Sequence, residues 1–491
     1  MLQMNRREFL IGCIGTAGAL ALSNKLVLNT DKAKRPNILL ALADDWSWPH
    51  ASIAGAKVVK TPHFDRIARE GVMFTNAFVT SPSCTPSRAS IVTGQYHWRL
   101  EEAANLHSTL DKKFEVYTDL LEKAGYHVGS SRKGVAPANI EMGGRKTNPV
   151  GHGYEKLQFF LQARPAGKPF CYWFGSRDPH RPYKEGSGVA SGMDASQVDV
   201  PACLPDSSQV RSDICDYYWA VQRFDRHLGR LLETLEKAGE LDNTIIVVTS
   251  DNGMPFPRCK ANLYDLGTHI PLAIRWPDKI KAGRIVDDFV SLQDLAPTFL
   301  EAAGLKPPTT MTGRSLMNIL TSEKTGQIDR NRDKVFTGKE RHNMCRQDKS
   351  GYPCRAVRTK DFLYIRNFKP DRWPAGDPEP ISTQGIYGDV DASPTKTYML
   401  EHKNAPQVKH LFELAFNKRP AEELYDLNKD PNQMSNVACN AEYAKIKEKL
   451  ALILTKELKT TKDPRILGNG DIFDKYPYYH GEFIEKPSDE V

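Results

Sequence analysis

The sequence lacks several features that would place it in a specialised class of proteins. Nine cysteines in 491 residues are too few for a disulfide scaffold, and there is no internal repeat or low-complexity segment. Beyond about the first two dozen residues, no apolar run is long enough to cross a membrane. A net charge of +7 is a mild excess for this length, so we expect no nucleic-acid partner. Hydrophobic (40%) and charged (26%) fractions are ordinary, which excludes disorder as the main state.

The N-terminus is typical of an export signal. Arg6 and Arg7 precede an uncharged apolar run over 11–22, a pattern that resembles a bacterial Tat signal. We therefore expect residues 1–23 to be the signal and the mature protein to work in the periplasm or outside the cell. The alternative is a lipoprotein signal in which Cys13 carries the lipid. Neither interpretation includes a transmembrane anchor.

Short apolar runs alternate with helical patterns along the first part of the chain. The runs over 38–43, 170–174 and 244–249 predict strands that are buried on both faces of a parallel sheet. Apolar residues at helical spacing, followed by glycine, predict helices over 116–124 and 217–238. This alternation predicts an α/β fold, with a mostly parallel sheet between layers of helices.

The pattern changes towards the C-terminus. Residues 356–365 predict a half-exposed hairpin, the Pro-, Gly- and Asp-rich residues 369–395 a long surface excursion, and 441–459 a helix. We therefore expect a main α/β domain over 34–350. A smaller α+β domain with an antiparallel sheet is expected over 351–491.

All three predicted strands run into polar residues. Asp44 and Asp45 follow the first strand, a cluster that includes His180 follows the second, and Asp251 and Asn252 follow the third. Ligands bind at the carboxyl ends of the strands in an open α/β sheet, so we expect these residues to converge. An isolated acidic residue after a strand is commonly an Asx turn. Three carboxylates and an amide, however, suit Ca²⁺ or Mg²⁺ rather than zinc.

The most specific motif is Cys84-Thr85-Pro86-Ser87-Arg88, ahead of a helical segment that ends at Gly94. Pro86 suits a first helical turn, so Cys84 would lie just before a helix N-terminus. Free N–H groups and the helix dipole favour an anion there. The alternative is a buried structural cysteine beside an ordinary helix.

These motifs together resemble the type I sulfatase family of the alkaline-phosphatase superfamily. The resemblance covers nearly the whole mature chain, and it is closest to the heparan N-sulfatase (sulfamidase) type and to bacterial polysaccharide sulfatases. The segments that carry it are Asp44-Asp45, Cys84-Thr85-Pro86-Ser87-Arg88, Asp178-Pro179-His180-Arg181, Asp251-Asn252-Gly253 and Thr312-Gly313-Arg314-Ser315-Leu316. The resemblance implies an alkaline-phosphatase-like sheet and makes 34–350 the catalytic domain.

The resemblance also implies a modified nucleophile and a metal. Cys84 matches the cysteine that a dedicated maturation enzyme oxidises to formylglycine (3-oxoalanine). The hydrated aldehyde can attack sulfur with one hydroxyl and expel sulfate through the other. Asp44, Asp45, Asp251 and Asn252 match the ligands of a single Ca²⁺, which the modified Cys84 also contacts.

Four further side chains match residues around the sulfate in that family. Arg88 matches the residue that steadies the formylglycine hydrate, and Lys133 and Lys260 match sulfate-binding cations. His180 matches the histidine that faces the leaving group and protonates it. Three carboxylates and Ca²⁺ sum to −1 and the three cations add +3, which leaves about +2 to attract sulfate. His269 either lines the substrate pocket or is a loop histidine bonded to the backbone.

One position departs from the family pattern. Many sulfatases have Gly-Lys-x-His where this chain has Arg132-Lys133-Gly134-Val135. Val135 therefore replaces a histidine, and a proton relay to the aldehyde hydrate must be absent or supplied from elsewhere. Cys345 and Cys354 flank a predicted turn and could pair in an oxidising compartment.

The sequence thus predicts an exported sulfatase that acts on a sulfated polysaccharide or its oligosaccharides. The target is either the N-sulfate of N-sulfoglucosamine, or an O-sulfate on another glycosaminoglycan or on an algal polysaccharide such as ulvan. A phosphate- or phosphonate-monoester hydrolase of the same superfamily is a second hypothesis, because some of these enzymes use the same aldehyde. A catalytically inactive binder of sulfated glycans is a third hypothesis, and it predicts the loss of a core residue.

Overall fold

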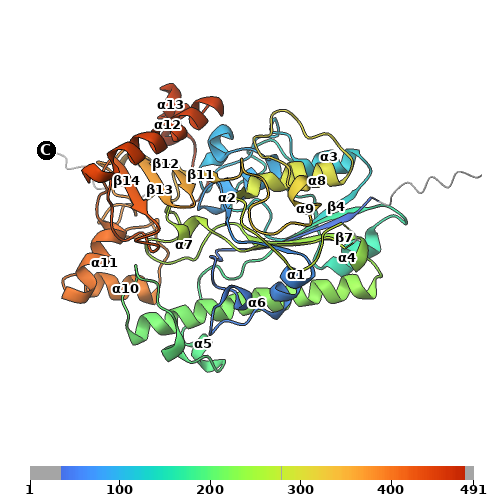
Figure 1. The fold of residues 1–491 in the computed structure, drawn as a ribbon, viewed down its shortest axis with the longest axis horizontal. Helices are drawn as coiled ribbons and strands as arrows, with labels where there is room; N and C mark the ends of the chain where they lie inside the picture. The colour runs from blue at the N-terminus through green and yellow to red at the C-terminus, as the bar shows by residue number, and fades with distance from the viewer. Residues whose placement is uncertain (1–34, 278, 481–491) are drawn as a thin grey trace, which may run out of the picture. The chain divides into compact units, whose positions relative to one another are not determined.

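The computed structural model describes residues 35–277 and 279–480 (Figure 1). The predicted export signal, including Cys13, lies outside these residues. The part of the chain from Pro36 onward forms one unit by its internal contacts.

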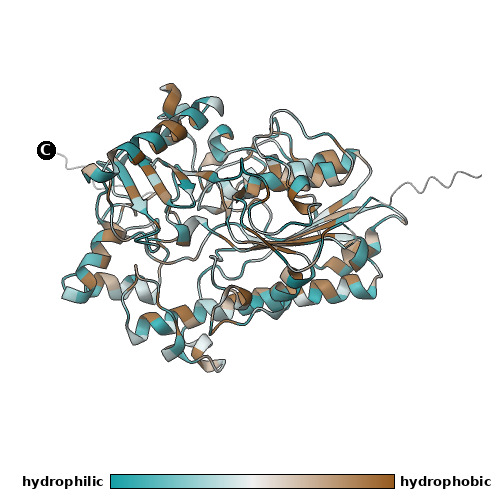
Figure 2. Ribbon diagram, in the orientation of Figure 1, coloured by the Kyte–Doolittle hydropathy of each residue, from teal (hydrophilic) through white to brown (hydrophobic). Residues whose placement is uncertain are grey.

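Three apolar strands form the centre of the main sheet. β1 (Asn37–Ala43) lies between β6 (Phe170–Gly175) and β7 (Thr244–Ser250) and is parallel to both. Every residue of these three strands is buried, and the ribbon is hydrophobic along much of their length (Figure 2). The three strands predicted from the sequence are confirmed.

The main sheet has eight strands in the order β5-β4-β6-β1-β7-β8-β2-β9. Strands from β5 to β7 are parallel, β8 is antiparallel to both its neighbours, and β9 is parallel to β2. The predicted mostly parallel sheet is therefore confirmed. The bounds of its remaining strands, and of the small β3–β10 pair, are β2 Val72–Phe74, β3 Ala77–Phe78, β4 His127–Arg132, β5 His152–Gly153, β8 Leu272–Arg275, β9 Arg284–Val286 and β10 Val290–Ser291.

Helices cover both faces of this sheet because successive side chains of a strand point to opposite faces. Leu39 and Ala41 pack with α1, α4 and α6, whereas Ile38 and Leu40 pack with α2, α3, α8 and α9 (Figure 1). The long helix α6 begins at Ser208, ahead of the predicted start, where the Ser207 side chain accepts the Val210 N–H. The bounds are α1 Pro62–Glu70, α2 Cys84–Thr93, α3 Tyr117–Lys123, α4 Leu157–Ala163, α6 Ser208–Lys237, α8 Leu295–Ala302 and α9 Met317–Leu320.

A second, antiparallel sheet is formed by the C-terminal part of the chain. Its order is β11 (Lys334–Lys339), β12 (Cys354–Thr359), β13 (Phe362–Asn367) and β14 (Glu422–Asp426), so it includes one strand from before residue 351. The predicted hairpin is β12–β13. Helix α12 (Ala444–Thr460) packs on one face, and Leu263 and Tyr264 of the main part pack on the other.

The segment 369–395 is not the surface excursion that its composition suggests. Ile381, Tyr387 and Val390 are buried, because this segment packs back onto the protein. It leads into two helices that the sequence analysis did not predict. The bounds of these and of the short helices are α5 Ser187–Ala190, α7 Asp265–Thr268, α10 Pro394–Glu401, α11 Pro406–Phe416, α13 Pro464–Leu467 and α14 Ile472–Lys475.

Two expectations about covalent and membrane attachment can be compared with the fold. Cys345 and Cys354 are both free and buried, so the disulfide that the sequence left open is not formed. Of the helices within 35–277 and 279–480, none combines the length and the apolar character needed to cross a membrane.

Candidate active site

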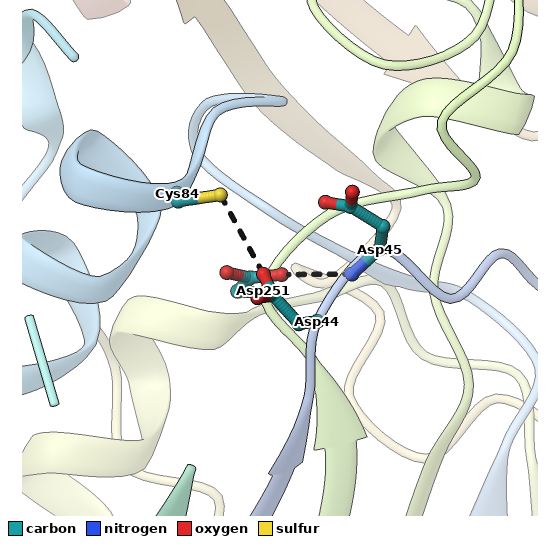
Figure 3. A group of neighbouring side chains, drawn as sticks. All are labelled: Asp44, Asp45, Cys84 and Asp251. Atoms are coloured by element: carbon teal, nitrogen blue, oxygen red, sulfur yellow. Dashed lines mark hydrogen bonds between the residues drawn. The ribbon is translucent and has the colours of Figure 1, made fainter. Parts of the chain in front are cut away.

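The carboxyl ends of β1 and β7 meet the start of α2. Asp44 and Asp45 follow β1, Asp251 follows β7, and Cys84 is the first residue of α2 (Figure 3). One potential ligand atom from each of these four side chains lies within 4.8 Å of all the others. The convergence predicted for the polar residues after the first and third strands is therefore found, and Cys84 joins them.

A turn at the end of β1 aims both of its aspartates at the cluster. Asp45 has a φ of 76°, in the left-handed region that Asp enters more readily than most residues. Its backbone N–H donates to Asp251 Oδ1 at 3.2 Å, while the Asp44 N–H donates to the Asp178 carbonyl at 3.0 Å. These two bonds join the ends of β1, β6 and β7 and fix the spacing of the carboxylates.

The Cys84 side chain is held among negative charges. Its Sγ lies 3.6 Å from Asp44 Oδ1, and the residue is only 2% exposed. Burial raises the pKa of this thiol well above its ordinary value; Lys133 lowers it, and Asp251 and Asp44 add to the rise. The unmodified side chain is therefore a neutral thiol at physiological pH, which is a weak nucleophile.

Each carboxylate of the cluster has its own buried cation. The three pairs are Arg88 Nε to Asp251 Oδ2 at 2.6 Å, Lys133 Nζ to Asp44 Oδ2 at 2.7 Å and Lys260 Nζ to Asp45 Oδ2 at 2.7 Å. The three negative and three positive charges of these pairs cancel, so a bound dication would leave these six side chains with a charge of about +2.

The pKa values of Asp44 and Asp251 shift in opposite directions in this environment. Burial alone would raise the pKa of Asp44, but Lys133 and Arg88 together hold it well below its usual range. Burial raises the pKa of Asp251 to about 6, because the neighbouring Asp44 adds to the effect and Arg88 offsets only part of it. Asp251 therefore carries charge that a further cation would stabilise.

The residues present fit a hard divalent cation. Asn252 donates through Nδ2 to Asp45 Oδ1 at 2.6 Å, yet its buried Oδ1 accepts no hydrogen bond from any residue that the structure describes. A buried carbonyl oxygen without a donor is costly unless it binds a cation or water. Together with the carboxylates of Asp44, Asp45 and Asp251, it makes an all-oxygen donor set of the kind that Ca²⁺ prefers.

Lys133 is positioned by backbone contacts at the end of β4. Arg132 has a φ of 62°, and the Lys133 N–H then donates to the Gly175 carbonyl at 2.8 Å. A Cβ at Gly175 would lie 1.7 Å from the Lys133 carbonyl oxygen, so only glycine allows this approach. Arg88 donates to the carbonyls of Lys133 and Gly134, both at 3.0 Å. Arg88 thus orients a carboxylate and a lysine of the same site.

His180 lies at the edge of the cluster, on a loop after β6. Its Nδ1 donates to the Arg181 carbonyl at 2.5 Å, which leaves Nε2 facing the site, 3.9 Å from Asp45 Oδ2. Arg181 in turn donates two hydrogen bonds to the Asp213 carboxylate of α6, from Nη1 to Oδ1 at 2.7 Å and from Nη2 to Oδ2 at 2.8 Å. The His180 side chain is 35% exposed, and it shares a cleft of about 530 Å³ with Asp44 and Lys133.

Asp391 is a member of this group that the sequence analysis missed. Its carboxylate lies 3.3 Å from Lys260 Nζ, and ligand atoms of Asp45, His180 and Asp391 fall within 4.8 Å of one another. No motif marks it, and only an unpredicted fold of segment 369–395 brings it here. Asp178 lines the same cleft as His180 and pairs with Arg223 at 2.5 Å.

His269 is not one of the residues of the acidic cluster. Its ring stacks on Phe78 and Trp48, with centroids 4.5 and 5.4 Å away, and Nε2 lies 2.8 Å from the Thr75 carbonyl. It lines a separate pocket of about 540 Å³ that contains none of the clustered residues. The contact with backbone that one of the two interpretations named is therefore present.

Val135 is fully buried in the apolar core, and a valine side chain has no group that can relay a proton. A different histidine, His342, lies next to the residue that precedes Cys84. His342 Nδ1 is 2.8 Å from the Oγ of Ser83, the residue that precedes Cys84. Burial lowers the pKa of His342 to about 3, so this ring is neutral.

Comparison with known proteins now separates one family from the alternatives. A sequence model described as Sulfatase matches residues 36–305, and a second, described as N-sulphoglucosamine sulphohydrolase, C-terminal, matches residues 259–409. The chain belongs to the sulfatase family. It is accordingly a sulfuric ester hydrolase.

This sulfatase is similar to characterised enzymes along most of its length. It is 30% identical to human N-sulphoglucosamine sulphohydrolase, over 92% of this chain and 95% of that protein. It is 28% identical to an ulvan-active sulfatase of Formosa agariphila, over 88% of this chain and 81% of that protein. In fold it matches a phosphonate monoester hydrolase of Silicibacter pomeroyi with a TM-score of 0.64 at 18% identity, covering 88% and 97% of the two chains.

Proposed function

We propose that this sulfatase is exported and removes sulfate from a sulfated glycan, with formylglycine at position 84 beside one bound Ca²⁺. Two observations support the proposal. Ligand atoms of Asp44, Asp45, Asp251 and Cys84 lie within 4.8 Å of one another, and the buried Oδ1 of Asn252 accepts no hydrogen bond from the residues that the structure describes. A maturation enzyme would have to act on Cys84, because the unmodified thiol is neutral and weakly nucleophilic.

The modification supplies what the thiol lacks. A hydrated formylglycine offers one hydroxyl to attack sulfur and a second whose loss of a proton expels sulfate, so no stable sulfate ester remains. Arg88 is the group that would hold this hydrate, because it is fully buried and already fixes Asp251 and the Lys133 loop.

The metal would be held by Asp44, Asp45, Asp251 and Asn252, and when bound it supplies charge stabilisation to sulfate oxygens. The residues of the chain perform the remaining binding. The ammonium groups of Lys133 and Lys260 both lie in the cluster. Lys133 contacts Asp44, and Lys260 contacts Asp45. With the carboxylates shared between metal and lysines, N–H donors of both lysines become available to a monoanionic sulfate.

His180 is the proposed proton donor to the leaving group. Because its Nδ1 is committed to the Arg181 carbonyl, only Nε2 can exchange a proton with the substrate. The same histidine lines the open cleft of about 530 Å³, which gives the departing sugar a place beside it. The arrangement corresponds to general acid catalysis by a ring whose orientation is already fixed.

The substrate is proposed from the relatives. Similarity to N-sulphoglucosamine sulphohydrolase, and the match of its C-terminal model over a range that contains Lys260 and Asp391, support N-sulfated glucosamine. Similarity to the ulvan-active enzyme supports an O-sulfated algal glycan as the other outcome. We take N-sulfated glucosamine as the first substrate to test.

The test is a screen of defined sulfated saccharides with protein produced together with a formylglycine-generating enzyme. Free sulfate is measured by ion chromatography for N-sulfated glucosamine, 6-O-sulfated glucosamine, 2-O-sulfated uronate and 3-O-sulfated rhamnose. Release from the first supports the proposal in full, and release from another corrects the substrate alone. Faster turnover of nitrophenyl phosphate than of nitrophenyl sulfate would make it a phosphate-ester hydrolase. Binding without any release, in protein that carries formylglycine, would make it a glycan binder.

A further inference from the structure

The cleft beside His180 is rich in arginine. In addition to Lys133 and His180, its wall includes Arg132, Arg177 and Arg223. Only part of this charge is used within the protein, because Asp178 neutralises Arg223 at 2.5 Å.

Two of the arginines have no acidic partner within residues 35–277 and 279–480. Neither Arg132 nor Arg177 lies within ion-pair distance of any carboxylate among the residues that the structure describes, and both are exposed. Arg132 is nevertheless held in place. Its guanidinium lies 5.4 Å from the centroid of the Phe174 ring, and its Nη2 lies 3.4 Å from Nε2 of His227. Burial lowers the pKa of His227 to about 4, so this ring adds no competing charge near Arg132.

Both arginines lie next to a residue that is proposed to contact the sulfate or the leaving group. Arg132 immediately precedes Lys133, and the Arg177 carbonyl accepts the His180 N–H at 3.1 Å. A sugar placed with its sulfate on Lys133 and its leaving atom at His180 would therefore extend past these two guanidinium groups. Guanidinium groups pair with carboxylates and sulfates through two parallel N–H donors, and unpaired ones at the edge of a substrate cleft favour an anion.

We propose that Arg132 and Arg177 bind a second anionic group of the substrate, distinct from the sulfate that is removed. The group is an oxyanion, either the carboxylate of an adjoining uronate or a second sulfate on the same sugar. This inference rests on the proposed function for the position of the substrate. It makes the preferred substrate a saccharide that carries at least two negative charges, and it assigns their recognition to two loops that also carry Lys133 and His180.

The test is a binding measurement that does not depend on turnover. Calorimetric titration of the non-hydrolysing Cys84→Ala chain compares glucosamine N-sulfate with its N,6-O-disulfate. A second pair of ligands is N-sulfoglucosamine linked to a uronate and the same disaccharide with its carboxyl group reduced to an alcohol. We expect a second anion to tighten binding about tenfold, more at low salt than at high salt. The pair that shows the difference identifies the anion as sulfate or carboxylate.

Variants then assign the effect to the two residues. Adding Arg132→Gln and Arg177→Gln together should remove the difference within each pair, and the lysine versions should retain part of it because the charge remains. Arg330→Gln, at an exposed arginine outside the cleft, is the matched control and should change nothing. Equal binding within both pairs, or a difference that survives the double glutamine change, would overturn the inference.

The binding result is separate from the test of the proposed function. If protein carrying formylglycine releases no sulfate while the charge-dependent difference in binding persists, the proposed catalysis fails and the anion subsite stands. If sulfate is released equally well from singly and doubly charged substrates, and binding is equal too, the subsite fails and the catalysis stands.

Discussion

Replacing Arg88 with methionine probes both the stability and the metal affinity of the site. Arg88 is fully buried, its Nε contacts Asp251 at 2.6 Å, and its Nη1 donates to the carbonyls of Lys133 and Gly134. Arg88→Met is close in shape but leaves the Asp251 carboxylate without its cation. Removing one partner of a buried ion pair costs about 3–5 kcal/mol, so we expect a loss of that size in the free energy of unfolding.

Calcium should change this loss in a defined direction. Without Arg88, the pKa of Asp251, already raised to about 6 by burial, rises further, so the carboxyl group is more often protonated. A dication that binds nevertheless supplies the missing positive charge. Because this doubly charged ion gains more from the uncompensated carboxylate than displacement of one proton costs, the variant should bind Ca²⁺ more tightly than the parent. The free-energy difference between the two should therefore shrink when Ca²⁺ is saturating.

The assay is urea unfolding at pH 7.5, in chelator and in saturating Ca²⁺, together with a calorimetric titration of Ca²⁺. Arg330→Met, at an exposed arginine, is the matched control and should unfold like the parent. A loss below 1 kcal/mol for Arg88→Met, or unchanged Ca²⁺ affinity, would refute the charge balance described for the site.

Three further changes have defined outcomes. Gly175→Ala places a Cβ 1.7 Å from the Lys133 carbonyl, so turnover should fall more than about tenfold and the melting temperature by several degrees; parent-like sulfate release would contradict this. His50 is buried with its pKa lowered to about 4, so protonation of the unfolded chain below pH 6.5 should cost about 3 kcal/mol of stability by pH 4. His50→Gln should remove that part of the acid-induced loss in urea unfolding, and an identical pH profile would disprove it. Asp391→Asn removes a negative charge 3.3 Å from Lys260, so inhibition by free sulfate should become several-fold tighter, and weaker inhibition would count against the assignment.

The positions of site residues in short motifs at strand ends could be predicted from the sequence, because the carboxyl ends of parallel strands lie along one edge of the sheet. Continuous apolar runs identified β1, β6 and β7, and the rule that ligands bind at the carboxyl ends of parallel strands united Asp44, Asp251 and their neighbours. The Cys84 motif and its family resemblance supplied Lys133 and Lys260, which no periodicity would have found.

Contacts made by loop segments were not predictable. Asp391 lies in a Pro- and Gly-rich segment whose composition suggested solvent exposure, yet Tyr387 and Val390 anchor that segment in the core. His269 follows Lys260 closely in sequence, but its ring turns to stack on Phe78 instead. In both cases the side-chain direction depends on tertiary packing, which local sequence does not encode.

The central claim is that residue 84, once modified, performs the chemistry. Protein samples with graded formylglycine content can be prepared by varying the maturation enzyme during expression, and the content can be measured by mass spectrometry of the peptide that contains Cys84. Turnover, measured as free sulfate released per protein molecule, should rise in proportion to that content and extrapolate to zero for the unmodified thiol. Sulfate release by fully unmodified protein, or by Cys84→Ala, at the rate of the modified enzyme would contradict the account.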